Sequence, residues 1–84
     1  MWNILFSATA KKQFEKLDKQ LQKRIISTLE RIRIRPEAYL KKLVGDPAYS
    51  LRVGDYRIII DLIKDRLIIL VLKVGHRKNI YENL

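Results

Sequence analysis

The sequence predicts a single α+β domain over residues 1–84, built from an N-terminal strand, a two-helix hairpin and a three-stranded antiparallel meander. Apolar residues recur every three or four positions across residues 8–35, which is the periodicity of amphipathic helices. Two runs rich in strand-forming residues follow at 56–63 and 67–74. Because helices and strands occupy separate blocks of the chain, both helices are expected to pack on one face of the sheet and leave the other face open.

The first two elements are expected to be a strand and a helix. Residues 2–6 (WNILF) are mostly aromatic or aliphatic, which favours a strand. Ser7 suits a helix N-cap, and an apolar stripe with spacings of four, three and four follows it. The stripe consists of Ala10, Phe14, Leu17 and Leu21.

A second helix is expected after Asp18, which interrupts the first pattern and suits another N-cap. Pro36 restricts the backbone of Arg35 and ends this helix. The apolar stripe of the second helix consists of Leu21, Ile25, Ile26, Leu29 and Ile32. One long kinked helix over residues 7–35 is the alternative that the pattern leaves open.

The segment after the helices is expected to be a loop that leads into the sheet. Residues 36–49 lack an apolar period and contain both prolines of the chain, with one short turn expected around residues 39–43. Residues 50–53 begin the sheet as a short strand. Gly54 and Asp55 then suit a two-residue type II′ turn, because glycine occupies the first turn position.

The strand at residues 56–63 has two different faces. Its even-numbered side chains are apolar or aromatic and are expected to meet the helices. Arg57 lies on the opposite face, two positions from Asp61. After a turn at residues 64–65, residues 66–74 are largely apolar on both faces, which predicts a central strand.

Composition limits the class of protein. The chain has no cysteine, which excludes a disulfide framework and a thiol nucleophile and favours the cytoplasm. A total of 18 Lys and Arg against 9 Asp and Glu gives a net charge of +9, which attracts polyanions such as nucleic acid. The excess is concentrated in residues 1–44, with 11 cations against 4 anions, compared with 7 against 5 in residues 45–84. A basic helical surface and a cationic sheet are therefore expected to be separate features.

Several reaction classes lack the residues they need. His76 is the only histidine and the acidic residues are scattered, so neither a single metal centre nor a two-metal nuclease is expected. The sequence contains no G-x-S-x-G nucleophile motif, no Walker A loop and no G-x-G-x-x-G motif. No cofactor is therefore expected.

The polar residues that remain suit metal-free cleavage of RNA, in which the 2′-hydroxyl attacks the adjacent phosphate and negative charge builds on the phosphoryl oxygens. Arg57 and Arg77 suit this charge because a guanidinium binds phosphate bidentately. His76 can serve as acid or base, and it is expected to face the open side of the sheet with Arg57 and Arg77. Simpler roles fit the same residues: Arg57 can pair with Asp61, and the last strand can end in solvated cations. Tyr81 equally fits a packing role.

Two motifs carry a resemblance to a known family. Residues 52–57 read RVGDYR, and residues 74–81 read VGHRKNIY after an apolar strand. Together with the order of helices and strands, this pairing resembles the RelE/ParE superfamily of toxins from toxin–antitoxin systems, and within it the RelE branch. The resemblance covers nearly the whole chain. It implies a ribosome-dependent endoribonuclease that cleaves mRNA in the ribosomal A site without a metal and arrests translation, with a small RelB-like antitoxin as its partner.

The resemblance also implies roles for individual residues. Arg57 matches the arginine that stabilises the phosphate in the transition state, and Arg77 matches the cation that contacts phosphate and assists the leaving group. Tyr81 lies near the position of the C-terminal tyrosine that helps to activate the 2′-hydroxyl or stacks on a base. Residues expected to bind RNA around this catalytic set are Lys41, Lys42, Arg52 and Lys78.

The sequence departs from the family where the general base is concerned. The best-known member has two lysines on the strand before the turn, whereas Ala48 and Ser50 occupy the corresponding positions here. The candidates for the base are His76, in first place, then Arg52, Lys41 and Lys42. Two alternatives remain: a ParE-like inhibitor of DNA gyrase, which needs no nuclease residues, and a non-catalytic module that binds RNA or the ribosome.

Overall fold

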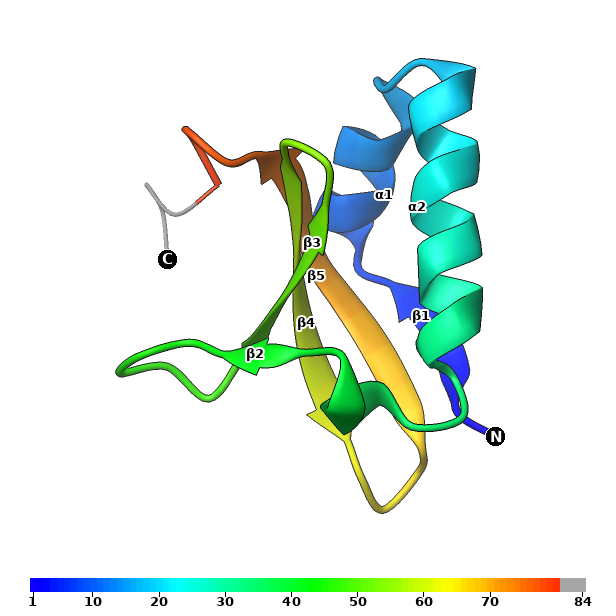
Figure 1. Ribbon diagram of the computed structural model, residues 1–84, viewed down its shortest axis with the longest axis vertical. Coiled ribbons are helices and arrows are strands. Elements are labelled where there is room, and N and C mark those ends of the chain that lie inside the picture. Colours follow the sequence, from blue (N-terminus) through cyan, green and yellow to red (C-terminus); the bar gives the residue numbers. More distant parts are fainter. Residues whose placement is uncertain (81–84) are drawn as a thin grey trace.

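The computed structural model describes residues 1–80 of the chain, which form one sheet with two helices. In chain order the elements are β1 (Asn3–Phe6), α1 (Ala8–Glu15), α2 (Lys19–Ile32), the 3-10 helix η1 (Pro36–Ala38), β2 (Lys41–Lys42), β3 (Tyr49–Val53), β4 (Tyr56–Ile63) and β5 (Ile68–His76). The strand order is β1-β5-β4-β3-β2, with β1 parallel to β5 and every other neighbouring pair antiparallel. Both helices lie on the same side of the sheet (Figure 1), which we call the helix side.

Each helix begins where the sequence places an N-cap. The side-chain oxygens of Ser7 and Asp18 accept hydrogen bonds from the backbone N–H groups of Ala10 and Leu21, at 3.0 and 2.9 Å. The prediction of two helices is therefore confirmed over that of one long helix. The second helix ends at Ile32, so the predicted end at residue 35 is wrong by three residues. Arg33 is its C-cap, and Arg35, which Pro36 restricts, lies outside the helix with φ −146°.

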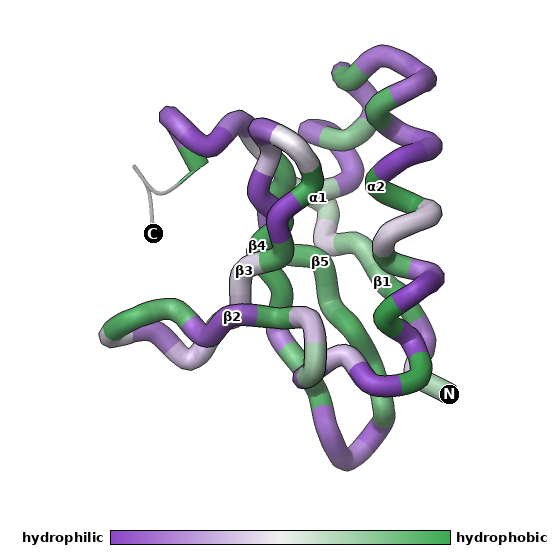
Figure 2. The backbone as a smooth tube through the Cα atoms, in the orientation of Figure 1, coloured by the Kyte–Doolittle hydropathy of each residue, from purple (hydrophilic) through white to green (hydrophobic). Residues whose placement is uncertain are grey.

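The main core lies between the helices and the sheet. It joins Ile25, Leu29 and Ile32 of α2 to Ile58 and Ile60 of β4, all of them 0 to 1% exposed. Figure 2 shows the corresponding pattern, with hydrophobic residues along β4 and β5 and alternating character along α2. Burying each such side chain contributes roughly 1.5–3 kcal/mol. Of the apolar stripe predicted for the second helix, only Ile26 turns away from this core, with 40% of its surface exposed.

Beyond the end of β1, the edge of β5 has no neighbouring strand, and side chains from the start of the first helix and from the helix itself bond its backbone. The Ser7 hydroxyl donates to the Leu72 carbonyl at 3.0 Å, and the Gln13 side-chain oxygen accepts from the Val74 backbone N–H at 2.7 Å. Backbone groups that β1 is too short to reach thus find side-chain partners. The predicted central position of the last strand is confirmed, because β5 lies between β1 and β4.

Three loops differ from the sequence prediction. The turn predicted at residues 64–65 is a four-residue loop, because Ile63 pairs with Ile68, and Leu67 takes a left-handed φ of 53° within it. The short turn predicted at 39–43 is wrong in position. Pro36 begins η1, because its fixed φ favours a helical first position. Residues 41–42 form the edge strand β2 instead of a turn. The Gly54-Asp55 hairpin is as predicted, with Gly54 at φ 60°.

A β-bulge divides β5 and decides which of its side chains reach which face. Ile59 pairs with Lys73 but Ile60 pairs with Val71, so Leu72 is an extra residue in β5. From this point the alternation of β5 is inverted. Lys73 lies on the face of Ile59 and Arg57, which is the side away from the helices and which we call the open side.

None of the helices in residues 1–80 is long and apolar enough to cross a membrane.

A second, smaller apolar cluster lies on the open side. Ala48, Ile59 and Ile80 are buried in it, with Leu43 and Leu72 packed against them. Ile80 comes from the segment after β5, which appears in red on the side of the sheet away from the helices in Figure 1. It sits on Gly75, where an added Cβ would lie 2.9 Å from the Ile80 Cδ1 atom. The absence of a side chain at residue 75 therefore allows this segment to pack.

Candidate functional site

A hollow of about 480 Å³ lies on the open side, next to the second apolar cluster. We call it the cationic hollow, because among residues 1–80 four of its lining side chains are basic and none is acidic. It is lined by Tyr39, Lys41, Lys42, Leu43, Val44, Ser50, Arg52 and Arg57. The edge strand β2 and the loop around it form one wall, and β3 and β4 form the floor.

The strand register brings the two arginines of this hollow together. Arg52 of β3 and Arg57 of β4 are direct cross-strand partners, so their side chains leave the sheet on the same face. The Cβ atoms of such partners lie about 4.5–5.5 Å apart, and like charges placed directly opposite each other destabilise a sheet. Among residues 1–80, neither arginine has an ion-pair partner to offset this repulsion. The salt bridge with Asp61, which is the simpler role for Arg57, is therefore not formed.

Within residues 1–80, the two arginine side chains make only long contacts, to backbone carbonyls. Arg52 Nε donates to the Gly54 carbonyl at 3.3 Å, and Arg57 Nη1 donates to the Tyr56 carbonyl at 3.4 Å. Both distances are at the long end for N–H···O hydrogen bonds. In the part of the chain that the structure describes, most of the guanidinium N–H groups have no hydrogen-bond acceptor and can bind an anion. A phosphate bound by both guanidinium groups would also offset the repulsion between their positive charges.

Arg77 follows β5 at the hairpin end of this face. Its backbone N–H donates to the Asp55 carbonyl at 2.8 Å, which continues the ladder that pairs Arg57 with Gly75. Its side-chain Nε lies 3.9 Å from Asp55 Oδ1, with both side chains more than half exposed. Such a solvent-exposed ion pair is worth little. A phosphate can therefore compete for Arg77 at little cost.

His76 lies on the helix side, away from the cationic hollow. It pairs with Tyr56, the two rings pack edge to face at 5.6 Å, and its Nδ1 accepts from the Lys78 backbone N–H at 3.2 Å. The expectation that His76 shares the open face with Arg57 is wrong. The cause is the bulge at Leu72, since uninterrupted alternation would have placed His76 on the open side.

The remaining predicted residues divide into three groups. Lys41 and Lys42 line the cationic hollow from β2, together with Arg52. Lys78 is exposed in the turn after β5 and does not line that hollow. Tyr81 lies outside the described residues.

Ala48 and Ser50, at the positions where the family resemblance implies lysines, are 5% and 8% exposed. Ala48 belongs to the second apolar cluster, where a charged side chain would be buried. The ladder through Ser50 places other lysines nearby on the same face, because it runs from Lys41 through Ser50 and Ile59 to Lys73. The bulge that directs Lys73 to this face had no recognised signal in the sequence.

Tyr39 and Val44 are two further residues of the hollow that sequence reasoning missed. Both are strongly exposed, with 54% and 102% of their surface accessible. They lie in the segment without an apolar period, so no pattern indicated which way they face. A basic segment that carries an aromatic residue, as at 39–42, was the available signal.

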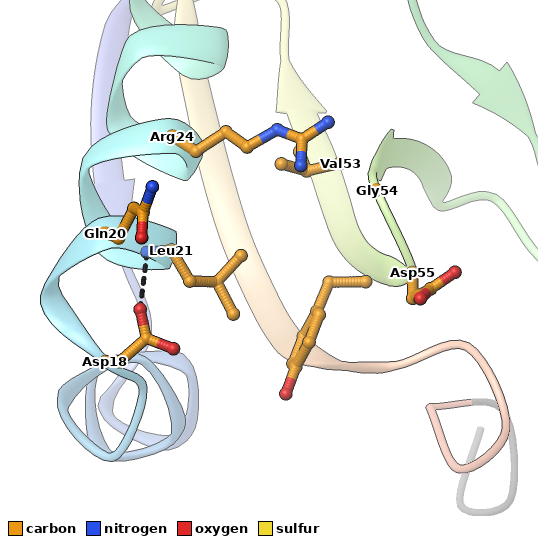
Figure 3. Close-up of a pocket in the computed structure, with 8 residues that line it drawn as sticks. Asp18, Gln20, Leu21, Arg24, Val53, Gly54 and Asp55 are labelled. Atoms are coloured by element: carbon orange, nitrogen blue, oxygen red, sulfur yellow. Dashed lines mark hydrogen bonds between the residues drawn. The ribbon is translucent and has the colours of Figure 1, made fainter.

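A second hollow of about 320 Å³ lies on the helix side, where α2 faces the β3–β4 hairpin (Figure 3). Asp18 and Asp55 contribute carboxylates to it and Arg24 contributes the one cation. The Asp18 carboxylate caps α2, as the dashed line in Figure 3 marks, and the Arg24 guanidinium lies over Gly54. With two acids and one base, this hollow is poorly suited to a polyanion. The cationic hollow is therefore the better candidate site.

A family model and several solved structures indicate the same group of proteins as relatives of this chain. The family model described as "ParE toxin of type II toxin-antitoxin system, parDE" matches residues 4–81. A search of curated proteins gives no significant match. Among solved structures, the chain is 30% identical to one from the RelB–RelE antitoxin–toxin complex of Methanococcus jannaschii, with a TM-score of 0.71 over 95% of this chain and 98% of that chain.

Two further solved structures have the same fold. The intact RelBE toxin–antitoxin complex of Escherichia coli is matched at 27% identity and a TM-score of 0.77, over 90% of this chain and 96% of that chain. The RelBE2 complex of Mycobacterium tuberculosis is matched at 22% identity and a TM-score of 0.82, over 90% of this chain and 98% of that chain. The chain belongs to the ParE toxin family of type II toxin–antitoxin systems, and its structure places it in the RelE-like branch of the RelE/ParE superfamily.

Proposed function

We propose that this toxin is an mRNA interferase, a ribosome-dependent endoribonuclease that cleaves mRNA in the A site and so inhibits translation. The observation that carries the proposal is the Arg52–Arg57 pair, two opposed guanidinium groups without ion-pair partners among residues 1–80, in a hollow lined by four cations. A structural arginine is normally paired or spread from its neighbours. Two arginines side by side, without an ion-pair partner in the described residues, suit an anion with several oxygens.

The proposed reaction needs no metal and no cofactor. The 2′-hydroxyl attacks the adjacent phosphate, the bond to the 5′-oxygen of the next nucleotide breaks, and a 2′,3′-cyclic phosphate remains on the first fragment. Arg57 binds the phosphoryl oxygens as their charge increases, and Arg77 donates a hydrogen bond to the leaving 5′-oxygen. The proton that the 2′-hydroxyl loses is balanced by the proton that the leaving 5′-oxygen gains, so the reaction consumes no net proton. Among residues 1–80, no group of three or more His, Asp or Glu side chains is arranged to hold a metal ion.

The geometry changes which residues are candidates for proton transfer. Lys41, Lys42 and Arg52 line the hollow, but ammonium and guanidinium groups donate hydrogen bonds and accept none. We therefore assign these three to phosphate binding, together with Lys78 along the outgoing strand of RNA. Tyr81 remains the proposed residue for activation of the 2′-hydroxyl, as the family resemblance implies. His76, on the helix side, is displaced as the first candidate for the base.

The proposed partners follow from the same surfaces and from the neighbours. The solved RelE structures that resemble this chain include complexes with RelB antitoxins. For this toxin we propose a small acidic RelB-like antitoxin, since a partner of opposite charge is attracted by a net charge of +9. The other partners are the ribosome and its mRNA, which implies action in the cytoplasm.

Induction of the intact chain in cells, followed by mapping of mRNA 5′ ends, tests the proposal. We expect translation arrest and new 5′ ends inside coding regions, and we expect both to disappear in the double variant Arg57→Ala, Arg77→Ala. Arg66→Ala is the matched control, because Arg66 is an exposed arginine of the β4–β5 loop at the opposite end of the sheet. Translation arrest without new mRNA 5′ ends would refute the nuclease activity. Non-catalytic binding to the ribosome would then be the remaining explanation.

A ParE-like gyrase inhibitor is the second candidate function. It is favoured by the description of the matching family model and by Ala48 and Ser50, which stand where lysines were expected. Accumulation of gyrase-linked DNA breaks after induction, without new mRNA ends, would support this function in place of the first. The Arg57 and Arg77 variants would then remain toxic.

A further inference from the structure

Tyr39 is an exposed aromatic residue whose backbone is firmly held. Its N–H donates to the Pro36 carbonyl at 3.0 Å, which closes η1, and Pro36 itself is buried. Two residues later, Lys41 pairs with Ser50 and fixes the chain to the sheet. The side chain nevertheless keeps 54% of its surface exposed. A ring displayed on an anchored backbone loses little conformational freedom when something stacks on it.

The surroundings of Tyr39 distinguish it from an ordinary surface tyrosine. Single exposed apolar residues need no special explanation. Tyr39, however, shares the cationic hollow with Arg52 and Arg57, and the fully exposed Val44 lies on the same wall. Proteins that bind single-stranded nucleic acid combine a positively charged groove for the phosphates with aromatic side chains on which bases stack. Both parts line the same hollow.

We propose that Tyr39 is a base-stacking residue, whose ring receives a nucleobase of single-stranded RNA while the neighbouring phosphates lie on Arg52 and Arg57. The inference rests on the proposed function, because it takes RNA as the substrate class. Tyr39 transfers no proton in this scheme. Its contribution is to substrate affinity and to the choice of cleavage position, because bases differ in how strongly they stack.

A binding experiment with two probes tests this directly. The probes are a short fluorescently labelled single-stranded RNA and the same ribose-phosphate chain with its bases removed, each titrated with the full-length toxin. Stacking on an aromatic side chain is worth about 1–3 kcal/mol per base. Tyr39→Leu is therefore expected to weaken binding of the base-bearing RNA roughly five- to 150-fold. Tyr39→Phe keeps the ring and is expected to bind like the wild type.

The abasic probe separates stacking from charge. Neither Tyr39 variant is expected to change its binding, because phosphate contacts stay intact. Ile34→Ala is the matched control, since Ile34 is another strongly exposed apolar residue and does not line the hollow. The proposal is overturned if wild-type toxin binds both probes equally, or if Tyr39→Leu binds the base-bearing RNA as tightly as the wild type.

Cleavage of ribosome-bound mRNA gives a second readout. Tyr39→Leu is expected to raise KM and to change the distribution of cleavage positions, with kcat retained. Absence of cleavage by the wild type would refute the proposed function alone, because base-dependent binding of free RNA would still decide the role of Tyr39. If Tyr39→Leu weakened the complex with the acidic antitoxin and left RNA binding unchanged, the ring would be a protein contact and the proposal would fail.

Discussion

The two sides of the sheet are built from the same strands and have opposite characters. On the helix side, buried aliphatic residues from α2, β4 and β5 pack into the main core. On the open side, a small apolar cluster is followed by a hollow lined with lysine and arginine. The helix side gains stability from burial. The open side includes Arg52 opposite Arg57, an arrangement that costs stability and that makes physical sense as a site for an anion.

The largest expected effect tests the helix side. Ile58 of β4 is fully buried in the main core, so Ile58→Ala is expected to lower the free energy of unfolding by about 2–5 kcal/mol. Chemical denaturation of the purified toxin measures this change. Ile34→Ala, at a side chain that is 77% exposed, is the control and should leave stability nearly unchanged. Equal losses in the two variants would contradict the placement of the core.

The next effect tests the open side at Arg57. Removing one donor aimed at the charge of a transition state typically costs about 10²- to 10³-fold in kcat. Arg57→Ala is expected to lose mRNA cleavage by this order, with no loss of stability, because Arg57 leaves no ion-pair partner behind among residues 1–80. Arg57→Lys should recover only part of the rate, since lysine cannot bind phosphate bidentately. Full activity in Arg57→Ala would remove Arg57 from the site.

These two residues also show where the sequence was informative. The alternation of β4 placed Ile58 and Arg57 on opposite faces, and the strand bounds of 56–63 agree with the structure. The N-caps at Ser7 and Asp18 were equally readable, because capping depends on local chemistry. Such features follow from neighbouring residues in the chain.

The features that the sequence could not provide depend on distant pairing. The bulge at Leu72 falls in a run that is apolar on both faces, so alternation does not reveal it and predicts the wrong side of the sheet for His76. The edge strand β2 has two residues and no period, and it exists because it pairs with β3. Tyr39 became a candidate only when this pairing brought its segment beside the two arginines.

An intermediate effect tests how the open side is closed over by the segment after β5. Gly75→Val is expected to destabilise the fold by about 1–3 kcal/mol, because the new side chain would meet Ile80 at a position where even a Cβ lies 2.9 Å from it. Denaturation of the double variant Gly75→Val, Ile80→Ala should show much of this loss recovered. An additive loss in the double variant would show that the two residues do not meet.

The smallest expected effect tests the repulsion between the two arginines. Arg52→Thr removes the like charge opposite Arg57, which should raise the free energy of unfolding by about 0.2–1 kcal/mol at low salt. Salt screens charges near the surface, so the gain should shrink as ionic strength rises. Denaturation at two salt concentrations measures both changes. A loss of stability at low salt would show that the pair is a stabilising structural contact.

The most direct test of the central claim is cleavage of a defined mRNA by purified toxin, with and without ribosomes that carry an empty A site. The account predicts cleavage within the A-site codon only when ribosomes are present, and its loss in Arg57→Ala while a wild-type-like fold is retained. An mRNA that stays intact on ribosomes in the presence of folded wild-type toxin would contradict the account.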